Sequence, residues 1–127
     1  MVKFKLKYRK LSIKIAQLLD RKKCEDIIIL DISKLSYICY YFVIATANSQ
    51  THMKSLENDI FEFCSLKHNM KFNPKLIRYE NISPIWHVYD FGGIVIHIML
   101  KETRKFYDLE RVWYKSKLIK WQKCKDD

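Results

Sequence analysis

Three aspartates stand at the ends of apolar runs, where a metal-dependent enzyme would place its carboxylates: Asp26, Asp31 and Asp90. Transfer of a nucleotidyl group needs a close cluster of carboxylates for two metal ions and a glycine-rich turn for the triphosphate. The three acids come from separate segments without an Asp-x-Asp or Asp-x-Glu pair, and the turn at 47–49 contains no glycine. We therefore expect loop and capping roles for these acids, with no catalysis and no cofactor.

The histidines and cysteines lack the spacing of a metal site or a nucleophilic site. The four cysteines are far apart and none belongs to a Cys-x-x-Cys pair, which argues against zinc. We expect Cys24 and Cys64 to be small buried hydrophobic side chains. His97 lies inside an apolar strand, so we interpret it as a hydrogen-bonded histidine of the core, with Asp90 on the neighbouring strand as its candidate partner. No Ser-His-Asp or Cys-His arrangement can be assembled.

The most specific pattern lies between residues 86 and 113. Two runs, 86–90 and 94–99, are typical of strands and are joined at the only two glycines of the chain. The second run is almost wholly apolar, which predicts a strand covered on both faces. Aromatic and charged residues crowd beside it, and aromatic residues and arginine are the usual anchors of protein interfaces. Trp113 is predicted to close the core, whereas Trp86 and Tyr107 fit a core role and an interface role equally well.

The elements that position these residues follow from hydrophobic spacing. Ser12 is the expected cap of a first helix that ends near Lys23, and strands are predicted at 27–32 and 40–46. Ser49 is the expected cap of a second helix that reaches about His68. A weak strand at 76–79 precedes the hairpin, and a last helix runs from Tyr107 as far as Cys124. The alternation of apolar and basic residues in 1–10 indicates a strand.

The run from 86 to 113 resembles the C-terminal signature of the ribosomal silencing factors, the RsfS or Iojap family. The matching residues are Trp86, Asp90-Phe91-Gly92, Ile96-His97-Ile98, Arg104, Tyr107, Leu109-Glu110 and Val112-Trp113. Blocks 22–31 and 41–49 also fit, so that the resemblance covers about 11–113 with every block in the expected order. Several ordered blocks are more specific than any single motif. Gly93 departs from the pattern, because the family usually has an aspartate there.

The resemblance implies an α/β (α+β) fold: a mixed five-stranded sheet packed with helices, like that of the nucleotidyltransferases but without their catalytic site. It also implies a function that is not enzymatic. Silencing factors bind the large-subunit ribosomal protein numbered fourteen and sterically block joining of the two subunits, which represses translation. The family's contact residues carry over to Trp86, Phe91 and Tyr107. Asp90, Arg104 and Glu110 match motif positions as well, and the resemblance leaves open whether they orient the contact surface or touch the partner.

Composition favours one domain, 1–127, with a core at about 11–113, a basic extension at 1–10 and a basic tail at 114–127. No apolar run approaches the roughly 20 residues of a membrane helix, and we expect a cytoplasmic protein. Residues 1–23 hold nine basic residues and one acid, and residues 101–127 hold nine and five. Such ends serve solubility or favour contact with ribosomal RNA. An RNA-binding or ribosome-assembly module acting through them is therefore the alternative function. The last helix and an open sheet edge could each support a homodimer.

Overall fold

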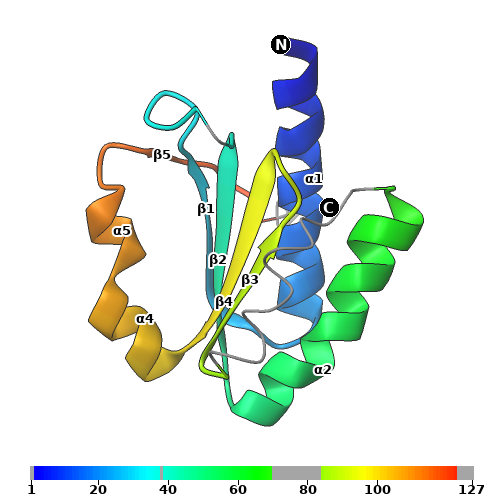
Figure 1. Ribbon diagram of the computed structural model, residues 1–127, viewed down its shortest axis with the longest axis vertical. Helices are drawn as coiled ribbons and strands as arrows, with labels where there is room; N and C mark the ends of the chain where they lie inside the picture. The colour runs from blue at the N-terminus through cyan, green and yellow to red at the C-terminus, as the bar shows by residue number, and fades with distance from the viewer. Residues whose placement is uncertain (1, 38, 70–83, 123–127) are drawn as a thin grey trace.

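The protein is described by a computed structural model, which covers residues 2–37, 39–69 and 84–122, with side chains from residue 5 onward (Figure 1). The predicted strand at 76–79 lies outside the described residues. The elements in chain order are α1 (Val2–Arg21), β1 (Glu25–Asp31), β2 (Tyr41–Ala47), α2 (Gln50–Phe61) with a π-helical extension η1 (Glu62–Lys67), β3 (Trp86–Asp90), β4 (Ile94–Leu100), α4 (Lys101–Tyr107), α5 (Leu109–Val112) and β5 (Lys117–Leu118).

The strands form one mixed sheet in the order β3-β4-β2-β1-β5. β2 and β4 are parallel, and the other three pairs are antiparallel. The predicted α+β fold with a mixed five-stranded sheet is therefore confirmed. Every residue of β4 except Leu100 is buried, as its continuous apolar sequence predicts.

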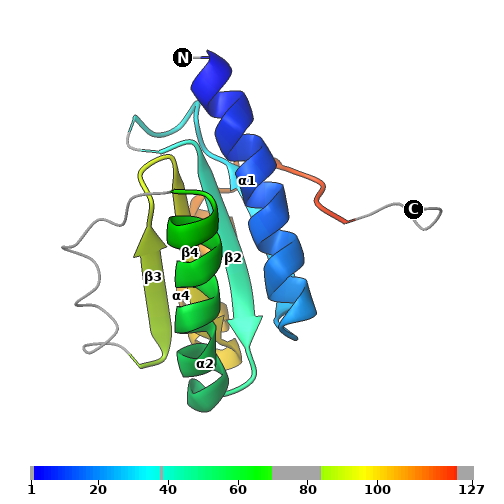
Figure 2. The ribbon, with the colours of Figure 1, turned by 90° about the vertical axis from the view of Figure 1, so that its right-hand side faces the viewer.

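Helices cover both faces of the sheet (Figures 1 and 2). α1 and α2 lie on one face, over side chains such as Ile29, Val43 and Ile96. α4 and α5 lie on the other face, where Leu109 and Trp113 pack against the cluster that contains Leu30 and Met99. Because successive strand residues point to opposite faces, each strand contributes to both cores. None of these helices, within the part of the chain that the structure describes, has the length and apolar character to cross a membrane.

The first helix begins earlier than predicted, and residues 2–10 are helical rather than extended. The strand prediction was wrong because the same residues also fit a helical stripe. Tyr8, Leu11 and Ile15 follow one another on the side that meets the sheet, and their packing selects the helix. Ser12 is consequently no cap: it lies inside α1, and its hydroxyl donates to the Tyr8 carbonyl at 2.8 Å.

The predicted second helix is confirmed. The Ser49 hydroxyl accepts a hydrogen bond from the His52 backbone N–H at 3.0 Å, which is the geometry of an N-cap. Met53, Leu56 and Ile60 are buried, and the stripe continues through η1 to Cys64. The predictions for the two buried cysteines hold as well, since burial raises the pKa of the Cys24 and Cys64 thiols to about 12 and leaves them unreactive.

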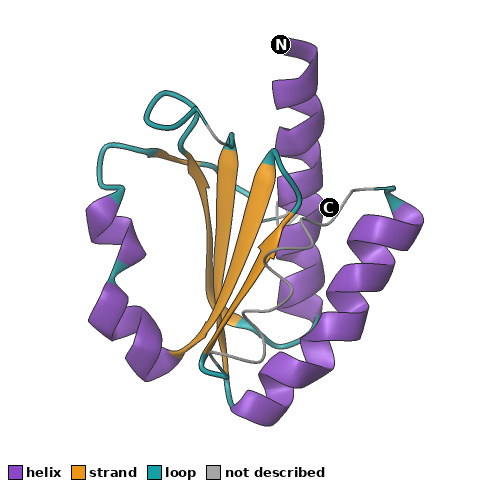
Figure 3. Cartoon of the chain, in the orientation of Figure 1, coloured by secondary structure: helices purple, strands orange, loops and turns teal. Residues whose placement is uncertain are grey.

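The chain after β4 differs from the single long helix predicted for 107–124. Two short helices, α4 and α5, meet at Asp108, whose left-handed backbone (φ 45°, ψ 61°) interrupts the helix (Figure 3). β5 then pairs with β1 and places Ile119 in the core. The core thus extends past residue 113, and the long terminal helix considered for a homodimer is absent from the described residues.

Candidate functional site

Trp86 opens the edge strand β3 and is held by a histidine of the neighbouring strand. Its indole N–H donates to Nδ1 of His97 at 3.1 Å, and the two rings lie 5.8 Å apart. His97 is therefore bonded to Trp86, and the predicted partner Asp90 is wrong. Burial lowers the pKa of His97 to about 4, so the ring is neutral at pH 7 and can accept this bond. The orientation of the indole is thus set by a buried group.

A row of aromatic rings leads from this histidine to the surface. Trp86 packs against Tyr107 with 4.8 Å between ring centroids and the ring planes tilted by 49°, and Tyr107 meets Phe106 edge-on at 5.1 Å. Exposure rises along the row, from 7% for His97 to 50% for Tyr107 and 78% for Phe106. We call Trp86, Tyr107 and Phe106 the aromatic surface. It presents large apolar side chains to solvent on rigid elements, as protein-binding anchors require.

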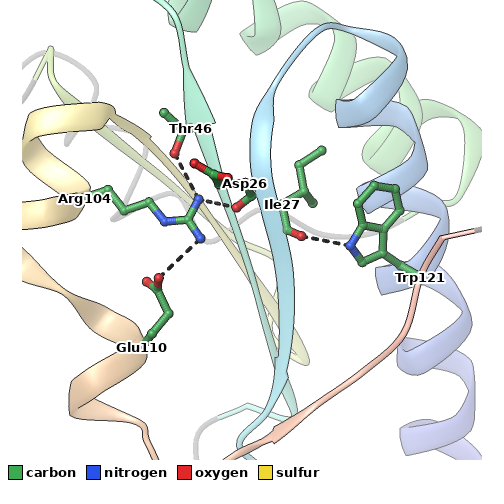
Figure 4. A network of polar contacts seen from close by, with 6 residues as sticks. All are labelled: Asp26, Ile27, Thr46, Arg104, Glu110 and Trp121. Atoms are coloured by element: carbon green, nitrogen blue, oxygen red, sulfur yellow. Dashed lines mark hydrogen bonds and ion pairs between the residues drawn. The ribbon is translucent and has the colours of Figure 1, made fainter.

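Arg104 is buried and joins the helices of this face to the sheet (Figure 4). One guanidinium nitrogen donates to the Thr46 hydroxyl at 3.0 Å and to the Asp26 carbonyl. The other lies 3.5 Å from the carboxylate of Glu110 on α5. A bulge in β1 between residues 25 and 28, with Asp26 in a left-handed conformation, accompanies this contact. Arg104 therefore positions α4 and α5, and its own side chain is shielded from a partner.

The remaining predicted residues, Asp90 and Phe91, lie at the other end of β3. Asp90 Oδ1 accepts from the Gly92 N–H at 2.8 Å and so stabilises the hairpin turn. Phe91 is buried in the core beneath α1 and α2. About 13 Å of strand separates Asp90 from Trp86. The structure thus brings together Trp86 with Tyr107, and Arg104 with Glu110, while Phe91 lies outside this group.

The three aspartates first considered for metal binding are far from forming one centre. Asp26 is exposed at the bulge, and Asp31 lies at the opposite end of β1, where its carboxylate is 3.2 Å from the Lys5 ammonium. Within residues 2–37, 39–69 and 84–122, no three histidine, cysteine or acidic side chains lie close enough to hold a metal ion. The exposed aromatic surface is therefore the site whose geometry points to a function.

Comparison with known proteins identifies the family to which this chain belongs. Residues 5–127 match the family model described as "Ribosomal silencing factor during starvation". The chain belongs to the ribosomal silencing factor family. The match extends on both sides of the blocks at 11–113, so that the basic segment of α1 from residue 5 and the C-terminal segment are included.

Relatives come from bacteria and organelles. The ribosomal silencing factor of Bacillus subtilis is 29% identical over 94 residues, which cover 74% of this chain and 76% of the relative. That of Chromobacterium violaceum is 34% identical over 72% of this chain and 71% of the relative. A mouse protein named "Mitochondrial assembly of ribosomal large subunit protein 1" is 29% identical over 78% of this chain and 43% of its own length.

A solved structure agrees with the fold. A crystal structure of a Chromobacterium violaceum protein superposes with a TM-score of 0.70 at 29% identity, covering 83% of this chain and 85% of that one. A Bacillus halodurans structure at 23% identity has a TM-score of 0.68 over 87% and 95%, and shares the fold.

This silencing-factor chain exposes further apolar residues on α4 and α5. Phe106, which is not a signature residue, is 78% exposed, and Val112, which the signature includes without assigning it a contact, is 66% exposed. Sequence spacing could not identify them, because a helix continuous from residue 107 would place its faces differently from two helices that meet at Asp108. The aromatic composition around Tyr107 was the available signal.

Proposed function

We propose that this protein binds the large ribosomal subunit and prevents it from joining the small subunit. The partner that we infer is the large-subunit ribosomal protein numbered fourteen, and the mechanism is steric occlusion without a chemical reaction. Membership of the silencing-factor family and the names of the relatives, which refer to ribosomal silencing and to large-subunit assembly, support this proposal.

The observation that carries the proposal is the exposed aromatic surface. Tyr107 and Phe106 are at least half exposed to solvent. Removing an aromatic side chain from water stabilises a protein by about 2 kcal/mol, and these two rings forgo much of that gain. Both rings rest on a rigid base, since Trp86 is bonded to His97 and α4 is fastened by Arg104. A partner that covers this surface gains apolar burial with little loss of side-chain entropy. Glu110, at the edge of the surface, adds charge specificity.

Sucrose-gradient sedimentation of purified subunits tests this proposal directly. We expect the wild-type protein to travel with the large subunit and to reduce the peak of joined ribosomes. The double variant Trp86→Ala/Tyr107→Ala should lose binding by at least thirtyfold, because central aromatic anchors each contribute about 1–2 kcal/mol or more. Tyr107→Ala alone tests the same surface with less disturbance of packing.

A matched control removes apolar side chains from the other side of the molecule. Phe61→Ala/Leu66→Ala alters residues of α2 and η1 that are 44% and 69% exposed. Binding of this control should equal that of the wild type. If the Trp86 and Tyr107 variants are folded and bind at wild-type affinity, the contact surface is wrong. If the wild-type protein binds while subunits still join, occlusion is wrong.

Truncation of the basic ends is not a suitable test of the alternative function, which is RNA binding through those ends. Residues 5–10 belong to α1, and Ile119 and Trp121 pack in the core. The Trp121 indole also donates to the Ile27 carbonyl at 2.9 Å (Figure 4). Gln17 donates to the Trp121 carbonyl. Removing either end would delete part of the core packing, so a loss of RNA binding would not separate a lost contact from a loss of folding. Substitution of individual surface charges is the informative experiment.

A further inference from the structure

A basic pocket lies at the end of the sheet opposite Trp86. Its volume is about 430 Å³, and its walls come from three places in the chain: the first half of α1, the segment after β1, and the approach to β5. Five cations line it, namely Lys5, Arg9, Lys34, Lys115 and Lys117, and we call this set the basic pocket. Two of them come from α1 and two from the C-terminal segment, so only the folded chain assembles the group.

Asp31, the one carboxylate among the described residues that line the pocket, is already engaged. Asp31 accepts hydrogen bonds from the backbone N–H and the hydroxyl of Ser33 at 3.0 and 2.6 Å, and it pairs with Lys5 at 3.2 Å. Burial alone would raise the pKa of Asp31, but the bonds from Ser33 and the charge of Lys5 outweigh it and lower that pKa. The other four cations have no carboxylate among the pocket residues to neutralise them.

The surroundings of the pocket favour a nucleic acid over an acidic protein. Tyr37 follows Lys34 in the segment after β1 and is fully exposed, at 109% of its reference area. Tyr37 is three residues from Lys34 in the chain. An exposed aromatic ring near cations suits RNA, because bases stack on the ring while cations neutralise phosphates. Leu6 and Leu35, which also line the pocket, provide an apolar surface for the face of a ribose or base.

One segment of the chain connects the aromatic surface with the pocket. The chain runs from α4 through α5 to β5 along one side of the molecule, so that Lys115 and Lys117 follow directly on the helices that present Tyr107 (Figure 1). If the protein is attached to the large subunit as proposed, ribosomal RNA is the polyanion available to the basic pocket.

We propose that the basic pocket binds the phosphate backbone of RNA, with Tyr37 stacking on a base, as a second attachment point beside the aromatic surface. This inference rests on the proposed function for the identity of the RNA, which is ribosomal. Binding at the pocket is independent of sequence, and it strengthens the attachment of a factor whose specificity comes from the protein contact.

The direct probe is a labelled RNA hairpin of about 20 nucleotides, titrated with protein at several salt concentrations. The test variant is Arg9→Gln/Lys34→Gln/Lys117→Gln, and the control is Lys14→Gln/Lys54→Gln/Lys67→Gln, which removes the same charge from exposed positions on α1, α2 and η1. Each lost phosphate contact reduces the slope of log K against log salt by about 0.9. For the pocket variant, the slope of log K against log salt should therefore be smaller by roughly 2–3, and its affinity for the hairpin at 0.1 M salt should be about a hundredfold lower than that of the wild type. The control variant should change little in slope or in affinity.

Variants of Tyr37 separate stacking from charge. Tyr37→Ala should weaken RNA binding by about fivefold or more without changing the salt slope, since base stacking on an aromatic ring is worth about 1–3 kcal/mol. Tyr37→Phe should bind as the wild type does. Equal RNA affinities and slopes for the pocket variant and its control would overturn the proposal. Pocket-dependent binding of poly-glutamate, without binding of the hairpin, would overturn it in favour of an acidic protein.

The hairpin contains no ribosomal protein, so this test is separate from that of the proposed function. Trp86→Ala/Tyr107→Ala should bind the hairpin normally while it fails to bind large subunits. If the wild-type protein ignores large subunits and still binds the hairpin through the pocket, the proposed function fails and the pocket stands. If it binds large subunits with a salt slope that the pocket variant shares, the pocket fails and the proposed function stands.

Discussion

Replacing Arg104 by methionine should destabilise the protein and displace the surface that α4 presents. The substitution keeps an unbranched, mostly apolar side chain of similar length and removes the guanidinium. A buried acceptor, the Thr46 hydroxyl, and a partly buried one, the Asp26 carbonyl, then lose their donor. Hydrogen bonds from a charged group contribute about 1.5–3 kcal/mol each, and a buried acceptor left alone keeps its desolvation cost.

The contribution of Glu110 is much smaller. Its side chain is 40% exposed and its distance to Arg104 is 3.5 Å, so solvent screening limits this pair to well under 1 kcal/mol. The total for Arg104→Met is therefore about 3 kcal/mol, which corresponds to a fall in Tm of about 10 °C for a domain of this size. Glu110→Gln should lower Tm by about 2 °C or less. The fall in Tm for Arg104→Lys should lie between these two values, because lysine keeps the positive charge but cannot donate hydrogen bonds from two nitrogens at once, as the guanidinium does.

Thermal and denaturant unfolding followed by circular dichroism measure these differences, with Arg111→Met as the control. Arg111 is an exposed arginine on α5, so its loss should cost less than about 0.5 kcal/mol. We also expect the Arg104→Met protein to bind large subunits more weakly at temperatures where it is still folded. Unfolding free energies of the Arg104 and Arg111 variants within 0.5 kcal/mol of each other would refute the positioning role of Arg104.

Two further predictions concern the interior. Because burial lowers the pKa of His97 from its ordinary value of 6.5 to about 4, the unfolded chain binds the proton first as pH falls, and stability is lost between about pH 6.5 and 4. This loss of stability amounts to about 3 kcal/mol. The difference in unfolding free energy between the wild type and His97→Gln should shrink by that amount over this pH range. Parallel curves of unfolding free energy against pH for the two proteins would contradict the lowered pKa of His97. A Cβ on Gly93 would lie 2.5 Å from the Tyr8 ring, so Gly93→Asp should cost about 2 kcal/mol in denaturant unfolding. Combining it with Tyr8→Ala should be less than additive, and strict additivity would show that the ring is not the obstacle.

The contact with Gly93 also bears on how the chain departs from its family. The resemblance places an aspartate at this position in most members, whereas here a glycine lies directly beneath Tyr8 of α1. Tyr8 in turn packs against Tyr40 at 5.6 Å between ring centroids. The glycine thus allows the basic first half of α1 to approach the hairpin. This approach holds Lys5 and Arg9 where they line the basic pocket.

The sequence alone determined the elements whose signals are local. Three elements formed as predicted: the helix with the stripe from Met53 to Cys64 and its Ser49 cap, the buried strand β4, and the hairpin around the two glycines. In each of them the spacing of apolar residues, or the residues of the turn, fits only one secondary structure. The residues of the family signature also come from these segments, so Trp86 and Tyr107 could be named before the fold was known. Local patterns suffice where a single secondary structure satisfies them.

The tertiary structure decided everything that depends on contacts between distant segments. Residues 5–10 fit a strand or a helix, and only packing of Tyr8 and Leu11 against the sheet selects the helix. The break at Asp108 and the pairing of β5 with β1 are likewise compatible with the sequence without being specified by it. The bond between Trp86 and His97, the burial of Phe91 and the assembly of the basic pocket all follow from strand register and layer packing. These are long-range contacts, and no pattern of neighbouring residues determines them.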